Sequence, residues 1–377
     1  MSQPLDMPRW LDLVVLPLVN LMLAFAVSAV VLLSIGQDPW QVLTLLIKGA
    51  FGSRTGLSYT LYYATTFVFT GLAVAVAFHA GLFNIGGEGQ AIMGGLGTGL
   101  VGLALGPHLP AWLLLPLMIA AAVALGMLWA AVPGALQAWR GSHVVITTIM
   151  FNFIASALLI YLLVNVLKEP GNMTPESRVF GPAAQLPGAH ELLGWIGIEW
   201  PRTPLNVSLL LAVAAALAVY LLVWRSQPGY ALRTVGHAPA AAHYAGIRPP
   251  TQIVRAMALS GGLAALVGIN EIAGVHNRLL ADFVAGAGFT GIAVSLIGRN
   301  HPLGIGLAAL LFGALYQGGA ELAFEIQGFS RDMVFTLQGL IVLFAGAMAQ
   351  VAAPSLARAY HALRRRLRRA PLEAQGG

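Results

Sequence analysis

The chain has 377 residues, of which 20 are lysine or arginine and 14 are aspartate or glutamate. The charged fraction of 9% is far below the value of about 25% in soluble domains, and the hydrophobic fraction is 58% with a mean hydropathy of +0.79. This composition excludes a soluble enzyme, because too few charged side chains remain to cover a surface that faces water. The absence of cysteine from the sequence excludes disulfides, thiolate nucleophiles and cysteine-based zinc sites.

About ten apolar segments follow one another along the chain, bounded by charged residues or by proline and glycine. They cover approximately residues 11–35, 58–78, 91–105, 112–132, 144–167, 205–224, 253–275, 283–297, 303–324 and 333–351. A helix needs roughly 20 residues to cross the hydrocarbon layer of a bilayer. We therefore expect an all-α polytopic integral membrane protein with about ten transmembrane or re-entrant helices.

Three of these segments are unusual in length or composition. The first is too long for the apolar core of a signal peptide, so we interpret it as a retained span. The third and eighth are short and rich in glycine, which favours re-entrant or broken helices. Irregular backbone at membrane depth needs protein or water around it, so these two segments are candidates for a transport path.

Basic residues in short loops mark the cytoplasmic side of a membrane protein. Residues 225–255 contain four arginines and no acidic residue, whereas residues 168–204 contain four glutamates against three basic residues. We therefore expect a transmembrane domain over residues 1–357, with 168–204 as an external loop and 225–255 in the cytoplasm. The basic tail, residues 358–377, holds six arginines and would place both termini in the cytoplasm.

Two details of this topology stay open. Lys48 and Arg54 would lie outside, against the usual charge distribution. The basic tail is either the signal that fixes the topology or a contact with anionic lipid, which attracts basic residues near the membrane surface.

The sequence contains no phosphate-binding loop. Such a loop needs a lysine after its glycines, and the only two lysines, Lys48 and Lys168, lie in other contexts. If ATP drives this protein, another chain hydrolyses it.

Polar residues inside apolar segments are costly and indicate function by default. The strongest cluster spans residues 81–90, where Asn84, Glu88 and Gln90 lie in a run with four glycines between two apolar segments. Glycine lets the backbone bend and approach closely, as in transporters whose broken helices form the substrate site. The alternative interpretation is a cytoplasmic loop with a structural carboxylate.

Further polar and aromatic residues have two interpretations each. Asn152 either binds a solute or joins two helices by a hydrogen bond, and Glu271 either faces a pore or lies near the outer interface with Arg278. The pair Gln317 and Glu321 lies on one helical face and leaves the same choice. Three aromatic residues lie near the expected helix breaks: Phe83, Phe151 and Phe289. Each ring either stacks on a flat ring of the solute or packs in the core.

A short helix is expected within the cytoplasmic segment. Pro239 is suited to begin it and Gly246 to end it, the usual asymmetry of helix ends. Two turns of alanine-rich helix have no core of their own, so we interpret them as a contact for a soluble partner, with a plain loop as the alternative. The residues assigned to this contact are Arg233, Gly236, Pro239, Ala241, Ala242, Tyr244 and Gly246.

Four stretches together resemble the permease subunits of bacterial ABC importers of the simple-sugar and nucleoside type, in the superfamily of branched-chain amino-acid permeases. They are residues 83–90, 146–152, 233–247 and 288–304. The likeness is greatest to the branch that takes up purine nucleosides with basic-membrane-lipoprotein binding proteins, and it covers most of the chain between residues 58 and 351. Two departures are Val144, where the family usually has an acidic residue, and Ala238 and Ala240, which replace an Asn and a Glu.

The resemblance implies a multi-pass subunit of the bacterial cytoplasmic (inner) membrane that pairs with a second permease, in a heterodimer. It implies an ATP-binding subunit below, which holds the ATP and Mg²⁺ that this chain lacks, and an extracytoplasmic substrate-binding protein above. Residues 239–245 would be the coupling helix that sits in a groove of the ATPase. The substrate path would be lined by Phe83, Asn84, Glu88, Gln90, Phe151, Asn152, Glu271 and Phe289.

The expected function is therefore ATP-driven import of a small neutral solute by alternating access, first a nucleoside and next a simple sugar, without enzymatic activity in this chain. The alternative is a proton-coupled secondary transporter that uses Glu88 and Glu271. An intramembrane enzyme finds little support, because the sequence lacks a nucleophile-elbow pattern and its histidines lack metal-ligand spacing.

Overall fold

The computed structural model describes residues 15–171, 173–326 and 333–340, together with the single residues 8, 343 and 360. Within these residues the regular structure is helical, apart from three isolated bridges between residue pairs. This confirms the predicted all-α membrane fold. The helices are α1 (Leu16–Ser34), α2 (Pro39–Phe51), α3 (Arg54–His79), α4 (Gly87–Leu105), α5 (Ala111–Arg140), α6 (Val144–Asn165), η2 (Pro182–Ala184), α7 (Ala189–Trp195), α8 (Ser208–Arg225), α9 (Gln227–His237), α10 (Pro239–Tyr244), α11 (Pro249–Gly268), η3 (Ile269–His276), α12 (Ala287–Ile297) and α13 (Pro302–Glu325).

The predicted apolar segments coincide with helices wherever the structure describes them. Among the described residues, six helices are long and apolar enough to cross a membrane, or seven if the bent pair Met22–Ser34 and Pro39–Phe51 is one span. The eighth predicted segment forms α12, whose 11 residues extend about 16 Å, half of the hydrocarbon thickness. Only residues 333–340 and 343 of the last segment lie within the described residues, and they are helical.

Helices α2 and α9 were not predicted from the sequence. Helix α2 begins at Pro39, and the chain bends by 119° between α1 and α2. Helix α9 occupies the first half of the predicted cytoplasmic segment, where Ser226 accepts the backbone N–H of Gly229 as an N-cap. Both were missed because α2 is amphipathic and α9 is polar, so neither forms an apolar block.

The chain divides into two compact units, one formed by residues 1–46 and 319–377 and the other by residues 47–318. The described part of the first unit has its own small core, in which aliphatic side chains from α1, α2, α13 and residues 333–340 meet. Its buried members are Leu32, Val42, Leu322, Val334 and Leu337. The second unit contains the residues of interest for function, and the following paragraphs concern it alone.

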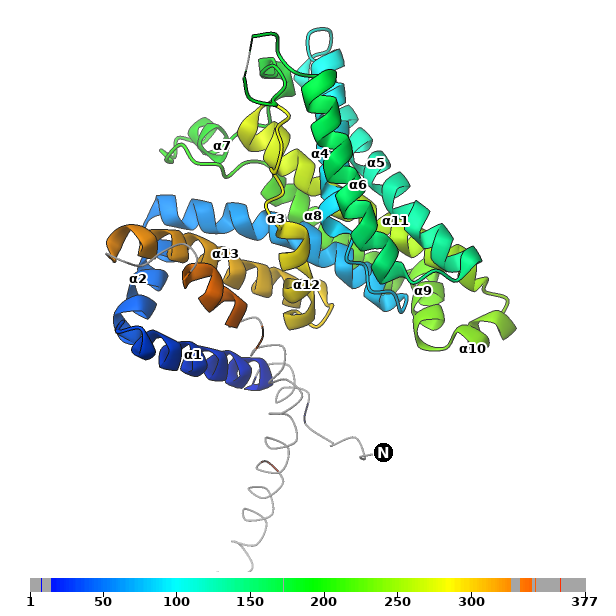
Figure 1. Cartoon of the computed structure of the whole chain (residues 1–377), viewed down its shortest axis with the longest axis horizontal. Helices are drawn as coiled ribbons and strands as arrows, with labels where there is room; N and C mark the ends of the chain where they lie inside the picture. The colour runs from blue at the N-terminus through cyan, green and yellow to red at the C-terminus, as the bar shows by residue number, and fades with distance from the viewer. Residues whose placement is uncertain are drawn as a thin grey trace, which may run out of the picture. The chain divides into compact units, whose positions relative to one another are not determined.

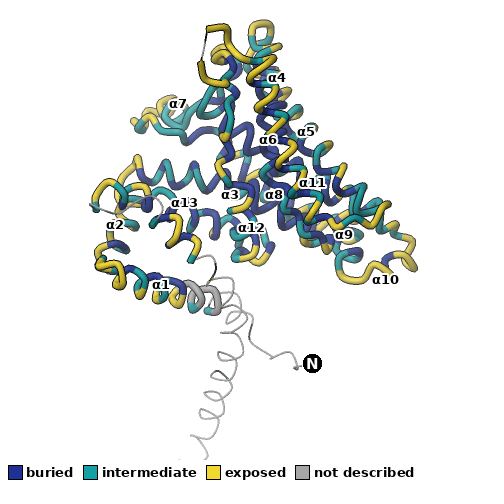
Figure 2. Tube along the Cα trace, viewed as in Figure 1, coloured by how far each residue is buried: buried dark blue, intermediate teal, exposed yellow. Residues whose placement is uncertain are grey.

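Helices α3 and α11 form the centre of the second unit. Of their most apolar stretches, 72% and 67% of the residues are buried, against 22% to 28% in α5, α6 and α8. Figure 2 shows this contrast, with α3 and α11 dark along most of their length and α5 and α6 carrying exposed faces. Helix α11 packs against α3, α4 and α5, and α12 packs against α3. The outer helices have the apolar exposed faces that suit contact with lipid.

Small residues allow the central helices to touch. A Cβ atom on Gly261 of α11 would lie 2.2 Å from the carbonyl oxygen of Gly126 in α5 and 2.4 Å from Cβ of Ala130. A Cβ atom on Gly94 of α4 would lie 2.2 Å from the carbonyl oxygen of Ala265 in α11. Such close backbone contacts are the usual basis of helix association in membranes.

The two predicted loop regions lie at opposite ends of α3. At its first residue, the Arg54 guanidinium donates to the carbonyl oxygen of Glu199 at 3.0 Å and lies over the Trp200 ring. At its last turn, the backbone of residues 79–81 contacts Gly236 of α9. Figure 1 shows α7 near one end of this unit and α9 and α10 near the other. The predicted segments 168–204 and 225–255, of which the last seven residues begin α11, therefore lie near opposite ends of α3.

We predict that Gly261→Val lowers the temperature of thermal unfolding in detergent micelles. Three extra carbons must fit where the α5 backbone already lies, and overpacking of this kind costs about 1–3 kcal/mol. Gly306→Val is the matched control, because a Cβ atom on Gly306 of α13 meets no heavy atom within 4 Å. Equal unfolding temperatures for the two variants would contradict the close α5–α11 contact.

Candidate functional site

The first turns of helices α4 and α12 meet at the carboxylate of Glu88. Glu88 lies in the first turn of α4, and its side chain reaches the start of α12. Oε1 accepts the backbone N–H of Gly286 and Oε2 accepts that of Gly288, both at 2.9 Å. The first amides of a helix lack an intrahelical acceptor and carry partial positive charge. A carboxylate between two such N-termini is therefore stabilised by both.

Glycine permits this approach of two backbones. A Cβ atom on Gly288 would lie 2.2 Å from the backbone nitrogen of Glu88 and 2.6 Å from its Cα atom. Gly286, directly before α12, has a φ angle of +81°, which glycine adopts without steric cost. Residues 286–288 thus turn the chain and allow the starts of α4 and α12 to touch.

Asn84 and Gln90 bind each other through their side chains. Asn84 Nδ2 donates to Gln90 Oε1 at 2.9 Å and to Ser260 Oγ at 2.8 Å. Ser260 of α11 donates in turn to the carbonyl oxygen of Ala73 in α3 at 2.6 Å. Both amide side chains are buried. This network fixes the segment before α4 to the two central helices.

Asn152 fixes the same segment from the side of α6. Its Nδ2 donates to the carbonyl oxygen of Ile85 at 2.9 Å, and its Oδ1 accepts the backbone N–H of Gly89 at 2.8 Å. A Cβ atom on Gly89 would lie 2.9 Å from Oδ1, so glycine is required there. Of the two interpretations of Asn152, this geometry favours the bond between helices.

Glu271 belongs to a second buried network. Its carboxylate accepts hydrogen bonds from the hydroxyl groups of Tyr62 and Thr66, the latter at 2.9 Å, and from Asn270 Nδ2 at 3.3 Å. Asn270 also donates to Thr66 and accepts from Asn206 Nδ2 at 3.0 Å. The network lies where α11 continues as the π-helix η3, a wider helical form that is frequent at functional sites.

Arg278, which lies near Glu271 in the sequence, pairs with another carboxylate. Arg278 Nη1 forms an ion pair with Glu176 Oε2 at 2.7 Å, which ties the predicted external loop to the turn after η3. The backbone N–H of Ser177 donates to Leu279 and that of Phe180 to Asn277 beside it. The partner of Arg278 lies about a hundred residues away, which neighbouring residues in the sequence cannot reveal.

The three predicted aromatic residues differ in their surroundings. Phe151 packs edge-on against Trp129, with ring centroids 5.2 Å apart. Phe83 is half-buried. Phe289, in the first turn of α12, is 49% exposed, so it is the one whose ring is most accessible to a solute.

The structure thus brings together most of the predicted path residues but not all. Residues 83–90, Asn152 and the start of α12 meet at the junction of α4 and α12, whereas Glu271 lies in its own network. The sequence interpretation missed Ser260, Gly286 and the hydroxyl groups of Tyr62 and Thr66. Residues 260–262 are all small, which indicates close packing but not a hydrogen bond to Asn84.

The predicted coupling segment forms two helices. Helix α10 begins at Pro239 and is followed by Gly246 with a φ angle of +78°, as predicted. Ala242 is buried, whereas Tyr244 is 92% exposed. Figure 1 shows α10 projecting beside α9. Arg233 and Gly236 lie on α9, which the sequence interpretation did not recognise as a helix; Ala241 is exposed.

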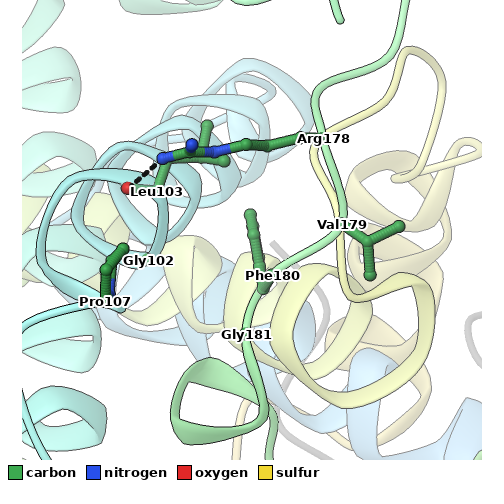
Figure 3. Close-up of a pocket in the computed structure, with 7 residues that line it drawn as sticks. All are labelled: Gly102, Leu103, Pro107, Arg178, Val179, Phe180 and Gly181. Atoms are coloured by element: carbon green, nitrogen blue, oxygen red, sulfur yellow. Dashed lines mark hydrogen bonds between the residues drawn. The ribbon is translucent and has the colours of Figure 1, made fainter.

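A pocket of about 180 Å³ opens between the end of α4 and residues 178–181. Figure 3 shows Arg178 reaching across it, where Nη2 donates to the carbonyl oxygen of Leu103 at 2.8 Å. A cation is stabilised at this position, because the last carbonyls of a helix carry partial negative charge. The predicted path residues do not line this pocket.

We predict that Asn152→Ala lowers stability by about 1–3 kcal/mol, because a buried carbonyl and a buried N–H lose their partner. Asn165→Ala is the matched control on α6, since the exposed Asn165 bonds only within its own helix turn. Thermal unfolding in detergent micelles measures both. If Asn152→Ala unfolds like the control yet fails in solute uptake, the amide acts on the solute instead.

Comparison with known proteins identifies the family. Residues 56–346 match the family described as the permease component of the branched-chain amino acid transport system. The chain is 36% identical to the glucose ABC transporter permease protein TsgB13 of Haloferax volcanii, over 89% of this chain and 88% of the relative. It is 33% identical to the guanosine permease protein NupP of Bacillus subtilis, over 90% and 94% of the two chains.

The nucleoside ABC transporter permease protein NupB of Lactococcus lactis is 30% identical over 88% of this chain and 90% of the relative. No solved structure matches the chain. The family match covers well over half of the residues and includes most of α3 and the helices from α4 to α13. This chain is a member of the branched-chain amino acid permease family, the multi-pass membrane subunits of ABC transporters.

Proposed function

We propose that this chain forms the translocation path for a nucleoside in an ATP-driven importer of the cytoplasmic membrane. The observation that carries the proposal is that two of the relatives that match about nine tenths of the chain are named for guanosine and for nucleosides. The relative named for glucose makes a simple sugar the second candidate. The ribose of a nucleoside and glucose both offer hydroxyl groups to a binding site. The nucleoside base is therefore the part that distinguishes a nucleoside from a simple sugar.

The energy would come from a partner. The sequence lacks a phosphate-binding loop, so ATP and Mg²⁺ would bind an ATPase subunit and this chain would not be an enzyme. Helix α10 is the candidate contact with that subunit. It projects from the fold with Tyr244 exposed and its second turn anchored by the buried Ala242. A cytoplasmic position for α10, the basic tail and both termini accords with the charge distribution of the sequence.

A second permease would complete the path. Two guanosine ABC transporter permease proteins of Bacillus subtilis, NupP and NupQ, both match this chain, which supports a heterodimer of related permeases. A substrate-binding protein would deliver the solute on the side of residues 168–204. That segment is held in place by the Arg278–Glu176 ion pair and by backbone hydrogen bonds, which suits a docking surface.

Within the path, we assign the solute contact to the aromatic rings of Phe289 and Phe83 near the α4–α12 junction. A flat ring stacks well on an aromatic side chain. The polar residues would then act indirectly, by holding α4 and α12 in place. They are Asn84, Glu88, Gln90 and Asn152. In alternating access, ATP binding would move the coupling segment and open this junction to the binding protein.

The test of the function is uptake into proteoliposomes that contain this chain with its co-purified partners. We expect [³H]guanosine to accumulate only when ATP is present on the ATPase side, and unlabelled nucleosides to compete more strongly than glucose. Vesicles with the chain alone are the control and should not accumulate solute. Competition by glucose but not by nucleosides would assign the sugar instead.

Uptake without ATP that collapses when a protonophore is added would contradict the proposal. It would favour the proton-coupled alternative, in which Glu88→Gln abolishes uptake completely. In the proposed importer, Glu88→Gln should retain part of the activity, because the amide oxygen still accepts one of the two N–H groups of α12, whereas Glu88→Ala should retain less.

We also predict that replacing residues 239–245 by a Gly/Ser stretch removes the ATPase from the complex. Helix α10 has few contacts with its own fold, so the variant should still insert into the membrane. Affinity purification of the tagged chain in mild detergent, followed by mass spectrometry, measures the loss. A Gly/Ser stretch of the same length in place of residues 189–195, near the opposite end of α3, should leave the ATPase bound. Retention of the ATPase by the 239–245 variant would refute the role of α10.

A further inference from the structure

A short connector, residues 80–86, joins α3 to α4 and contacts both the coupling segment and the α4–α12 junction. It begins beside α9 and ends directly before Gly87, the first residue of α4. The next residue is Glu88, whose carboxylate binds α12. Its non-helical backbone is anchored along its length by Asn84 and Asn152. Because the connector is short and is held by buried hydrogen bonds, it is suited to move as a rigid body.

The first joint is a contact of backbone with backbone. A Cβ atom on Gly236 of α9 would lie 2.2 Å from the carbonyl oxygen of His79 and 2.9 Å from the nitrogen of Gly81. Conversely, a Cβ atom on Gly81 would lie 3.2 Å from Cα of Gly236. Because no side chain separates the two backbones, a displacement of α9 is not absorbed by a rotamer change and passes to the connector.

The second joint holds the far end of α12. His79 Nε2 lies 3.0 Å from the carbonyl oxygen of Asn300, just after α12, and donates to it. The His79 ring also packs edge-on against Trp224 of α8, with centroids 5.0 Å apart. Asn300 is held in turn by Ser295 Oγ, which donates to its Oδ1 at 2.8 Å.

The third joint is the Glu88 carboxylate on the amides of Gly286 and Gly288. Helix α12 is therefore attached at both ends to one continuous stretch of chain, through His79 before the connector and through Glu88 after it. Between these two joints α3 packs closely against α12, since a Cβ atom on Gly71 would lie 3.1 Å from Cγ1 and 3.7 Å from Cβ of Val294. Helix α12 and the connector thus form one packed body.

Building on the proposed function, we propose that Gly236, His79 and Glu88 are the residues that transmit movement of the coupling helix to the translocation path. Displacement of α10 and α9 pushes the connector through the Gly236–Gly81 contact. Because α12 is held at both ends, it moves with the connector and the end of α3, and the α4–α12 junction is displaced as a unit.

The first test is Gly236→Ala in the complete transporter reconstituted in proteoliposomes. We expect ATPase binding and ATP hydrolysis to persist while the number of solute molecules imported per ATP falls about fivefold or more, the size of a lost coupling between sites. Gly306→Ala is the matched control and should keep the wild-type ratio. An unchanged ratio in Gly236→Ala overturns the proposal, as does loss of the ATPase itself, which would give α9 a role in assembly only.

The second test does not depend on Gly236. The chain has no native cysteine, so a disulfide can be placed between α3 and α12 with the double variant Gly71→Cys and Val294→Cys, at a Cβ–Cβ distance typical of disulfides. If the two elements move as one body, the oxidised variant imports solute at the rate of the reduced one. If oxidation stops import while the single-cysteine variants are unaffected, α12 slides along α3 and the proposal is wrong.

These outcomes are separable from failure of the proposed function. If wild-type vesicles show no ATP-dependent uptake, the importer proposal fails and no ratio exists to compare. If wild-type uptake is normal and either variant behaves contrary to expectation, only the transmission proposal fails.

Discussion

The arrangement of this protein depends on the Glu88 carboxylate that receives the first amides of α12. A helix that starts within an apolar layer leaves unpaired N–H groups, and each costs several kcal/mol where water is absent. Here the partner of those amides is fixed on the first turn of another helix, and the glycines at 286 and 288 bring the two backbones into contact. The start of α12 is thereby held against the start of α4, with these first amides paired.

The remaining buried polar groups near this junction serve the same purpose. Asn84, Gln90 and Asn152 direct their side chains to one another, to Ser260 or to the backbone of residues 85–89. A polar network whose members all have partners is rigid and defines one arrangement. These hydrogen bonds hold residues 84–90 firmly against α6 and α11. In the proposed mechanism, movement enters at the contacts of the connector with α9 and α12.

Membership of a permease family gives these details a functional setting. The relatives are ABC transporter permeases for nucleosides and for glucose, solutes that carry no charge. The proposed path accords with that, since the carboxylates of Glu88 and Glu271 accept hydrogen bonds from helix amides and from hydroxyl groups, and the ring of Phe289 is exposed. The exposed helix α10 and the loop of residues 168–204 lie near the two ends of α3, where we propose the contacts with soluble partners.

The sequence by itself determined the membrane class, the position of the apolar helices and the short helix from Pro239, because hydropathy and helix-end signals are local properties. It also placed residues 83–90 and 288 onward among the unusual segments. Only the tertiary structure decided that Glu88 binds α12, that Asn152 binds the backbone of Ile85 and Gly89, and that Arg278 pairs with Glu176. These partners lie 63 to 200 residues apart, and nothing in a single segment encodes which distant backbone will be packed against it.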